Sequence, residues 1–135
     1  MRLRLALIVL APLICASPAL AATKHGITPL SPGAGDEVPK GEAPTFRARV
    51  HGSGQVWVRV CSSARRDRDG VICDRLALGR ATRHKGGVYT FKPRMRDFPE
   101  FWLNRPGTYH WQAYRLACVG SDCRAEGPIV RFRVG

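Results

Sequence analysis

The residues between positions 106 and 118, PGTYHWQAYRLAC, bring several chemically capable side chains into one short stretch of sequence. His110 could accept a proton, Arg115 could pair with an anion, and Glu100 lies shortly upstream. A histidine, a carboxylate and an arginine are groups with which a small secreted basic ribonuclease could work. This ribonuclease hypothesis requires the three side chains to meet in one cleft, which their spacing alone does not indicate.

The same stretch alternates between apolar and polar side chains, which is the pattern of a strand with one buried face. One face would carry Tyr109, Trp111 and Ala113. The opposite face would carry His110, Gln112 and Tyr114. We expect the first set in the core and the second exposed to water or to a partner. Consecutive strand positions point in opposite directions, so the cluster is not expected to form a catalytic group.

The rest of the chain contains no motif of a common catalytic or metal-binding type. There is no G-x-S-x-G nucleophile elbow, no P-loop and no H-E-x-x-H zinc motif. Asp67 and Asp69 are spaced like ligands of a calcium loop, but Arg65 and Leu76 would then occupy its first and twelfth positions. We therefore expect no enzyme activity, no catalytic residue, no metal and no cofactor.

The N-terminus has the three parts of a secretory signal peptide. A basic start, MRLR, precedes the apolar run LALIVLAPLI, and the ALA sequence at residues 19–21 offers small residues for cleavage. The apolar run is too short to span a bilayer, so we expect residues 1–21 to be removed and the mature chain to have no membrane span. Cys15 raises the alternative of a lipidated N-terminus, although the bulky Leu13 and Ile14 precede it.

The chain is strongly basic, with 22 lysine and arginine residues, 10 aspartate and glutamate residues and a formal net charge of +12. A basic surface attracts nucleic acids, anionic envelope polymers and lipid head groups. The arginines of the mature part are spread from residue 47 to residue 133 rather than clustered. We therefore expect non-specific binding to anions and no specificity for nucleic acid.

Short alternating segments between glycine and proline turns predict an all-β fold, an antiparallel β-sandwich of about seven strands formed by residues 22–135. Residues 22–42 are expected to be an extended segment that could contain a first strand around residues 27–30. A polar loop is expected at residues 62–70, and one short helical turn near residues 97–103. The expected core residues are Phe46, Val56, Val58, Val60, Trp111, Val130 and Phe132.

The segment LNRPGTYHWQA resembles the link before strand F, and the start of that strand, in fibronectin type III and related bacterial immunoglobulin-like domains. Those domains have a leucine, a Pro-Gly turn and a tyrosine corner, which Leu103, Pro106, Gly107 and Tyr109 match. The resemblance implies a sandwich of this type, in which the tyrosine hydroxyl bonds to the backbone of the link and stabilises it. As a departure from the family pattern, Trp57 is out of phase with the neighbouring valines.

The mature chain retains four cysteines, Cys61, Cys73, Cys118 and Cys123. An even number in an exported chain predicts two disulfides. On the topology that the resemblance implies, Cys61 and Cys118 end antiparallel strands and therefore lie at opposite poles, too far apart to be bridged. We expect Cys61–Cys73 and Cys118–Cys123. The spacings fit neither a zinc site nor a redox-active C-x-x-C pair.

The loop between the first two cysteines is rich in charge. It contains Arg65, Arg66 and Arg68 within the sequence SSARRDRDG. A tethered, charged loop can serve in recognition. The same composition is also typical of a solvated hairpin held by a disulfide, and the sequence leaves both interpretations open.

These observations predict a secreted, non-enzymatic module with a structural or protein-binding role outside the cell or at its surface. A second hypothesis is a module that binds carbohydrate or an anionic envelope polymer. It would use Trp57, Arg59, Tyr114 and Arg115 as one binding face on a single sheet, because aromatic rings stack on sugars and arginines pair with acidic groups. The expected partner is accordingly a protein or an envelope polymer.

Overall fold

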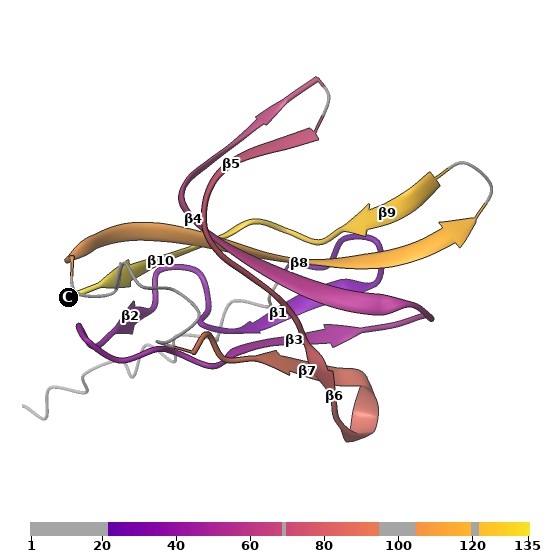
Figure 1. The fold of residues 1–135 in the computed structure, drawn as a ribbon, viewed down its shortest axis with the longest axis horizontal. Coiled ribbons are helices and arrows are strands. Elements are labelled where there is room, and N and C mark those ends of the chain that lie inside the picture. The colour runs from indigo at the N-terminus through magenta and orange to yellow at the C-terminus, as the bar shows by residue number, and fades with distance from the viewer. Residues whose placement is uncertain (1–21, 69, 95–104, 120–121) are drawn as a thin grey trace, which may run out of the picture.

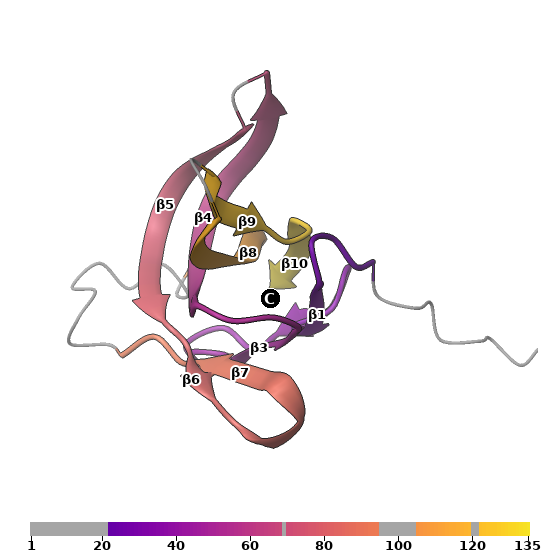
Figure 2. The ribbon, with the colours of Figure 1, turned by 90° about the vertical axis from the view of Figure 1, so that its right-hand side faces the viewer.

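The computed structural model describes residues 22–68, 70–94, 105–119 and 122–135. Within these ranges, the side chains of residues 66, 67, 70, 72, 118, 119, 122 and 123 are not described. Figure 1 shows a fold built almost entirely of β-strands, and Figure 2 shows its two layers, with β3 and β7 below β4 and β8. Two β-sheets thus pack face to face, as the alternating sequence pattern predicts.

The two sheets differ in size. The first contains, in spatial order, β1 (Ile27–Ser31), β3 (Phe46–Val50), β7 (Val88–Phe91) and β6 (Thr82–Arg83). The second contains β2 (Glu37–Val38), β10 (Val130–Val134), β8 (Gly107–Val119), β4 (Gln55–Asp67) and β5 (Gly70–Arg80). In addition, β9 (Asp122–Glu126) pairs with the C-terminal half of β8. Neighbouring strands are antiparallel except β2 and β10.

The expected all-β sandwich is therefore confirmed, but its details differ from the expectation. The described residues form ten strands rather than about seven, because the short β2 and β6 and the added β9 have no clear sequence signal. The first strand expected around residues 27–30 is present as β1, which pairs with β3, whereas β2, which pairs with β10, is an additional strand within residues 22–42. A 3-10 turn, η1 (Lys85–Gly87), precedes β7. The helical turn expected near residues 97–103 lies outside the described residues.

The core lies between the sheets and is made by alternate residues of the long strands. All seven residues expected there are buried, namely Phe46, Val56, Val58, Val60, Trp111, Val130 and Phe132. The ring of Phe46 connects both layers, with its centroid 5.4 Å from that of Trp111 and 5.8 Å from that of Phe132. Full burial of an apolar side chain of this size contributes about 1.5–3 kcal/mol to stability.

Two buried aromatic residues of β8 have backbone partners for their polar atoms. The hydroxyl of Tyr109 donates to the carbonyl of Arg105 at 2.7 Å, which ties the preceding link to the strand. The indole nitrogen of Trp111 donates to the carbonyl of Pro32 at 2.9 Å. Such bonds avoid the cost of burying an unpaired polar group. Pro106 and Gly107 are exposed beside this bond, and Leu103 lies outside the described residues.

Strands β4 and β5 extend beyond the sandwich as a long twisted hairpin (Figure 1). The prediction of a polar loop at residues 62–70 is wrong for most of these residues, because β4 and β5 remain paired as far as Asp67 and Gly70. Strand pairing uses backbone groups, so the polar side chains of this segment do not interrupt it. A disulfide between Cys61 and Cys73, with the Cα atoms 5.6 Å apart, links the two strands at the base of the hairpin.

Candidate functional site

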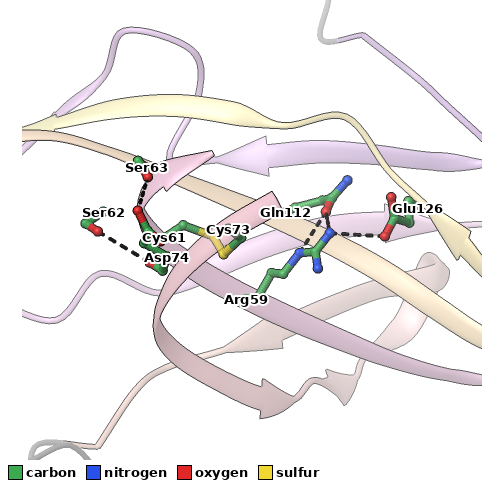
Figure 3. The surroundings of a disulfide bond; sticks show 8 residues. All are labelled: Arg59, Cys61, Ser62, Ser63, Cys73, Asp74, Gln112 and Glu126. Carbon is green, nitrogen blue, oxygen red and sulfur yellow. Dashed lines mark hydrogen bonds and ion pairs between the residues drawn. A yellow bond between two sulfur atoms is a disulfide. The ribbon is translucent and has the colours of Figure 1, made fainter. Parts of the chain in front are cut away.

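The outer face of the larger sheet carries a polar cluster centred on Arg59 of β4 (Figure 3). Nε of Arg59 donates to Oε1 of Gln112 on β8 at 2.9 Å, and Nη2 contacts the same oxygen. Nη2 also donates to Oε1 of Glu126 on β9 at 3.1 Å. β4 and the two strands of the β8–β9 hairpin therefore meet at one guanidinium group.

Cross-strand register brings these side chains together. Val56, Val58 and Val60 of β4 face the core, so the alternating Trp57 and Arg59 face outward. Arg59 lies opposite Gln112, Trp57 lies opposite Tyr114, and Tyr114 lies opposite Glu126. The cluster is thus a direct consequence of strand alternation and the pairing of β4, β8 and β9.

Gln112 is a buried amide with both of its ends paired. Its side chain is only 1% exposed. Its oxygen accepts hydrogen bonds from Arg59, and its Nε2 donates to the carbonyl of Gly127 at 2.7 Å. Because both ends are engaged, the amide can hold the Arg59 guanidinium in one orientation.

Tyr114 lies beneath two guanidinium groups. Cζ of Arg59 is 5.6 Å from the centroid of the Tyr114 ring, and Cζ of Arg124 on β9 is 5.0 Å from it. Both distances are within the range of cation–π attraction. Nη1 of Arg124 also lies 3.7 Å from Oε1 of Glu126, while just over half of the Arg124 side chain remains exposed.

The expectation that Gln112 and Tyr114 face water is wrong, since both are buried. They do point away from the core, but Arg59 and β9 cover them. Tyr114 is only 6% exposed, so its ring offers no open face on which a sugar could stack. Trp57 beside it is half-buried, and its indole nitrogen donates to Oε1 of Gln55 at 3.4 Å.

Arg115 does not share this face, although the sequence analysis places it there. It lies opposite Val56, a core position, and is next to Tyr114 in the same strand. Alternation therefore directs its side chain to the other side of the sheet. At that end of the sandwich, its Nη1 donates to the carbonyl of Ser53 at 2.9 Å. Three of the four residues expected on one face remain together, namely Trp57, Arg59 and Tyr114.

A pocket of about 390 Å³ adjoins the cluster, between the β4–β5 hairpin and β9. Its lining residues are Arg59, Val71, Cys73, Arg75, Leu78, Tyr114 and Arg124. We call it the arginine pocket, because three of these residues are arginines. Pockets that hold small molecules have volumes of about 300–1,000 Å³, so the size is compatible with a ligand group.

The sequence analysis identifies Arg59 and Tyr114 but misses Arg75, Arg124 and Glu126. The last two alternate around Ala125, which is a weak signal for a strand. No sequence signal indicates that this strand pairs with β8 rather than continuing into β10. Arg75 follows a register irregularity between β4 and β5, so its position opposite Cys61 could not be read from alternation.

The three residues of the ribonuclease hypothesis are not assembled in the described structure. His110 and Arg115 lie on opposite sides of β8, five positions apart, and Glu100 lies outside the described residues. Nδ1 of His110 is buried and has no hydrogen-bond partner among the described residues. Burial, and secondly the positive charge of Arg131, lower the pKa of His110 below its usual value of 6.5.

The remaining candidate residues lie on or near the two hairpins. Arg65 and Arg68 are exposed on the β4–β5 hairpin, whereas the side chain of Arg66 is outside the described part. The Cys118–Cys123 pairing also concerns side chains that the structure does not describe. The Cys118–Cys123 disulfide therefore stays a prediction.

The described ranges contain no group of three or more histidine, cysteine, aspartate or glutamate side chains placed to hold a metal ion. Across the same part of the chain, no helix has the length and apolar character needed to cross a membrane. Residues 1–21, which are expected to be a signal peptide, precede the described residues.

Comparison with known proteins adds no relative from which a function could be transferred. No protein-family model matches the sequence. No curated protein is significantly similar to it.

Proposed function

We propose that this chain is a secreted, non-enzymatic module of the fibronectin type III or immunoglobulin-like type, which binds a protein partner outside the cell or at its surface. The strand order β1-β3-β7-β6 in one sheet and β10-β8-β4-β5 in the other supports this fold type. The first order corresponds to A-B-E-D of immunoglobulin-like sandwiches, and β10-β8-β4 corresponds to G-F-C, with β5 as an additional strand beside C. The hydrogen bond from Tyr109 to the link at Arg105 supports it further.

The observation that carries the binding role is the arginine pocket with its supporting cluster. Burying the charge of Arg59 and the amide of Gln112 costs desolvation energy, and apolar residues could fill the same space without that cost. A buried polar network is more readily explained when it positions a group for a task. Here it positions one guanidinium at a pocket that is also lined by residues of β5, in the β4–β5 hairpin.

Two further observations support the extracellular, non-enzymatic part of the proposal. The Cys61–Cys73 disulfide is of a kind that persists in oxidising compartments, in agreement with the signal-like N-terminus. His110 and Arg115 lie on opposite sides of β8, so those two residues could not act on one substrate atom. A binding role requires neither of them.

A second candidate is binding to an anionic envelope polymer. The same outer face carries Arg131 and Arg133 of β10, both exposed, in addition to the arginines of the pocket. A row of guanidinium groups along one face suits a repeating anion. The rigid, partly apolar pocket favours a protein partner over this alternative, since a repeating charge needs neither a pocket nor a fixed orientation.

The experiment is co-sedimentation of oxidised protein, residues 22–135, with cell-envelope fractions at low salt and at about 1 M salt, where the Debye length is about 3 Å. We expect binding that survives high salt and disappears when the envelope fraction is first treated with protease. Binding that survives protease treatment but is lost after digestion of the polysaccharides would favour the second candidate. Complete loss at high salt would contradict the proposed protein partner, because the attraction would then come from exposed charges that salt screens.

A further inference from the structure

We propose that the arginine pocket recognises an organic anion, namely a carboxylate, sulfonate or phosphate group attached to an apolar body. This inference rests on the proposed function, since the anion would be the group by which the module recognises its partner. It assigns separate roles to the three arginines and to the apolar part of the lining.

The three guanidinium groups of the pocket are not equivalent. Arg59 is committed to Gln112 and Glu126, and its side chain is only 12% exposed. Arg124 is 52% exposed, and its 3.7 Å approach to Glu126 is too long for a hydrogen bond. Arg75 is exposed and has no hydrogen-bond or ion-pair partner among the described residues. Arg75 and Arg124 therefore retain donors for a ligand, while Arg59 contributes fixed positive charge.

The charge balance of the pocket indicates the sign of the ligand. Among the described side chains, three guanidinium groups and no carboxylate line the pocket, and Glu126 contacts two of these guanidinium groups from outside the lining. Positive charge therefore remains in excess after Glu126 is counted. Guanidinium groups bind carboxylate, sulfonate and phosphate oxygens through charge-assisted hydrogen bonds, which are about twice as strong as neutral ones. A cationic ligand would meet net repulsion.

The rest of the lining is apolar and indicates the body of the ligand. Val71 and Leu78 of β5 are half-buried, and Cys73 is engaged in the disulfide. The ring of Tyr114 borders the pocket on the side of β8 but is itself buried, so the half-buried side chains of Val71 and Leu78 are the apolar surfaces that a ligand could cover. A free inorganic anion would leave these surfaces in contact with water, whereas an attached apolar group would cover them.

The pocket is held in shape before any ligand arrives. The disulfide joins β4 to β5 next to Arg75, which lies opposite Cys61. Two hydrogen bonds also join these strands: Ser62 of β4 donates to the backbone carbonyl of Asp74 on β5, and Ser63 of β4 donates to the Asp74 carboxylate (Figure 3). Fixing these groups in advance lowers the ordering cost of binding.

The test is a titration of oxidised, ¹⁵N-labelled protein, residues 22–135, with 2-naphthoate, followed by two-dimensional NMR. We expect saturable shifts of backbone amides at residues 71–78, 112–114 and 124–126. 2-Naphthamide has the same apolar body without the charge, and inorganic phosphate has the charge without the body. Each should bind at least about tenfold more weakly, because each lacks one of the two kinds of contact. Equal binding of 2-naphthamide or of phosphate would overturn the proposal.

A matched pair of double variants separates the pocket from general charge. Arg75→Gln with Arg124→Gln removes two charges from the pocket. Arg47→Gln with Arg49→Gln removes two charges from exposed positions on β3, in the other sheet. We expect the first pair to weaken 2-naphthoate binding about tenfold or more and the second to leave it unchanged. Equal weakening by both pairs, or shifts centred elsewhere, would overturn the proposal.

If salt-resistant binding to envelope protein persists while 2-naphthoate fails to bind, the anion class is wrong and the module still binds a partner through another surface. If 2-naphthoate binds in the pocket while no envelope fraction is bound at high salt, the proposed partner role is wrong and the anion site stands.

Discussion

Arg59 of β4 and Gln112 of β8 lie directly opposite each other, and Nε of the arginine donates to Oε1 of the glutamine at 2.9 Å. The amide also donates to the carbonyl of Gly127, which leads from β9 toward β10. One buried amide thus connects a central strand of the larger sheet, the Arg59 guanidinium and the chain after β9. The stability of the outer face should depend on it.

Replacing Gln112 by leucine should lower the free energy of unfolding by about 2–3 kcal/mol, because Arg59 and the Gly127 carbonyl would both lose a buried partner. Urea denaturation followed by tryptophan fluorescence measures this change. The double variant Arg59→Met with Gln112→Leu should recover part of the loss, since neither polar group then remains unpaired. An unchanged unfolding midpoint for Gln112→Leu alone would show that the amide is not structural.

Gly79→Ala should destabilise the sandwich by about 1–3 kcal/mol, as is typical of overpacking. A Cβ at this position would lie 2.0 Å from Cε2 of Phe91, so the ring would have to move. Phe91 packs on Phe46, with their ring centroids 6.4 Å apart, and a shift would disturb the core. Calorimetry measures the fall in Tm. Adding Phe91→Leu should make the alanine easier to accommodate; if the two changes simply add, the clash is not the cause.

Replacing Cys61 and Cys73 by alanine should reduce stability by about 2–3 kcal/mol, the amount that the chain-entropy model assigns to a loop of this size. Their sequence separation is 12 residues. Hydrogen exchange should become faster mainly at the base of the β4–β5 hairpin. The exchange rates of the β3 amides should change only as far as the global free energy of unfolding changes. Protection that is unchanged at residues 60–75 would contradict a local role of the disulfide.

Stability should fall as the pH decreases below about 6.5, because the pKa of His110 is lower in the folded protein than in the unfolded chain. Burial, and then Arg131, disfavour the charged imidazole, so the unfolded state binds more protons in this window. Urea midpoints at about pH 7.5 and about pH 5 measure the effect. The His110→Gln variant should lose this part of the pH dependence. A His110 pKa at or above 6.5 by NMR would contradict the prediction.

The sequence by itself determines the sides of the strands. Side-chain direction alternates at every residue of a strand, so local order assigns Val56, Val58 and Val60 to one face and Trp57 and Arg59 to the other. The same rule places Trp111 in the core. It also places the consecutive residues Tyr114 and Arg115 on opposite faces of β8, although the sequence analysis assigns them to one binding face. The sequence therefore already contains the information that separates these two side chains.

Only the tertiary structure decided which outward-facing residues are covered and which meet in a site. Gln112 and Tyr114 are buried because β9 pairs beside them and Arg59 reaches across from β4. The arginine pocket exists because β5 continues past a register irregularity and brings Arg75 near Arg124. Strand pairing is made by backbone groups that every residue carries, so side-chain types alone do not specify which segments become neighbours.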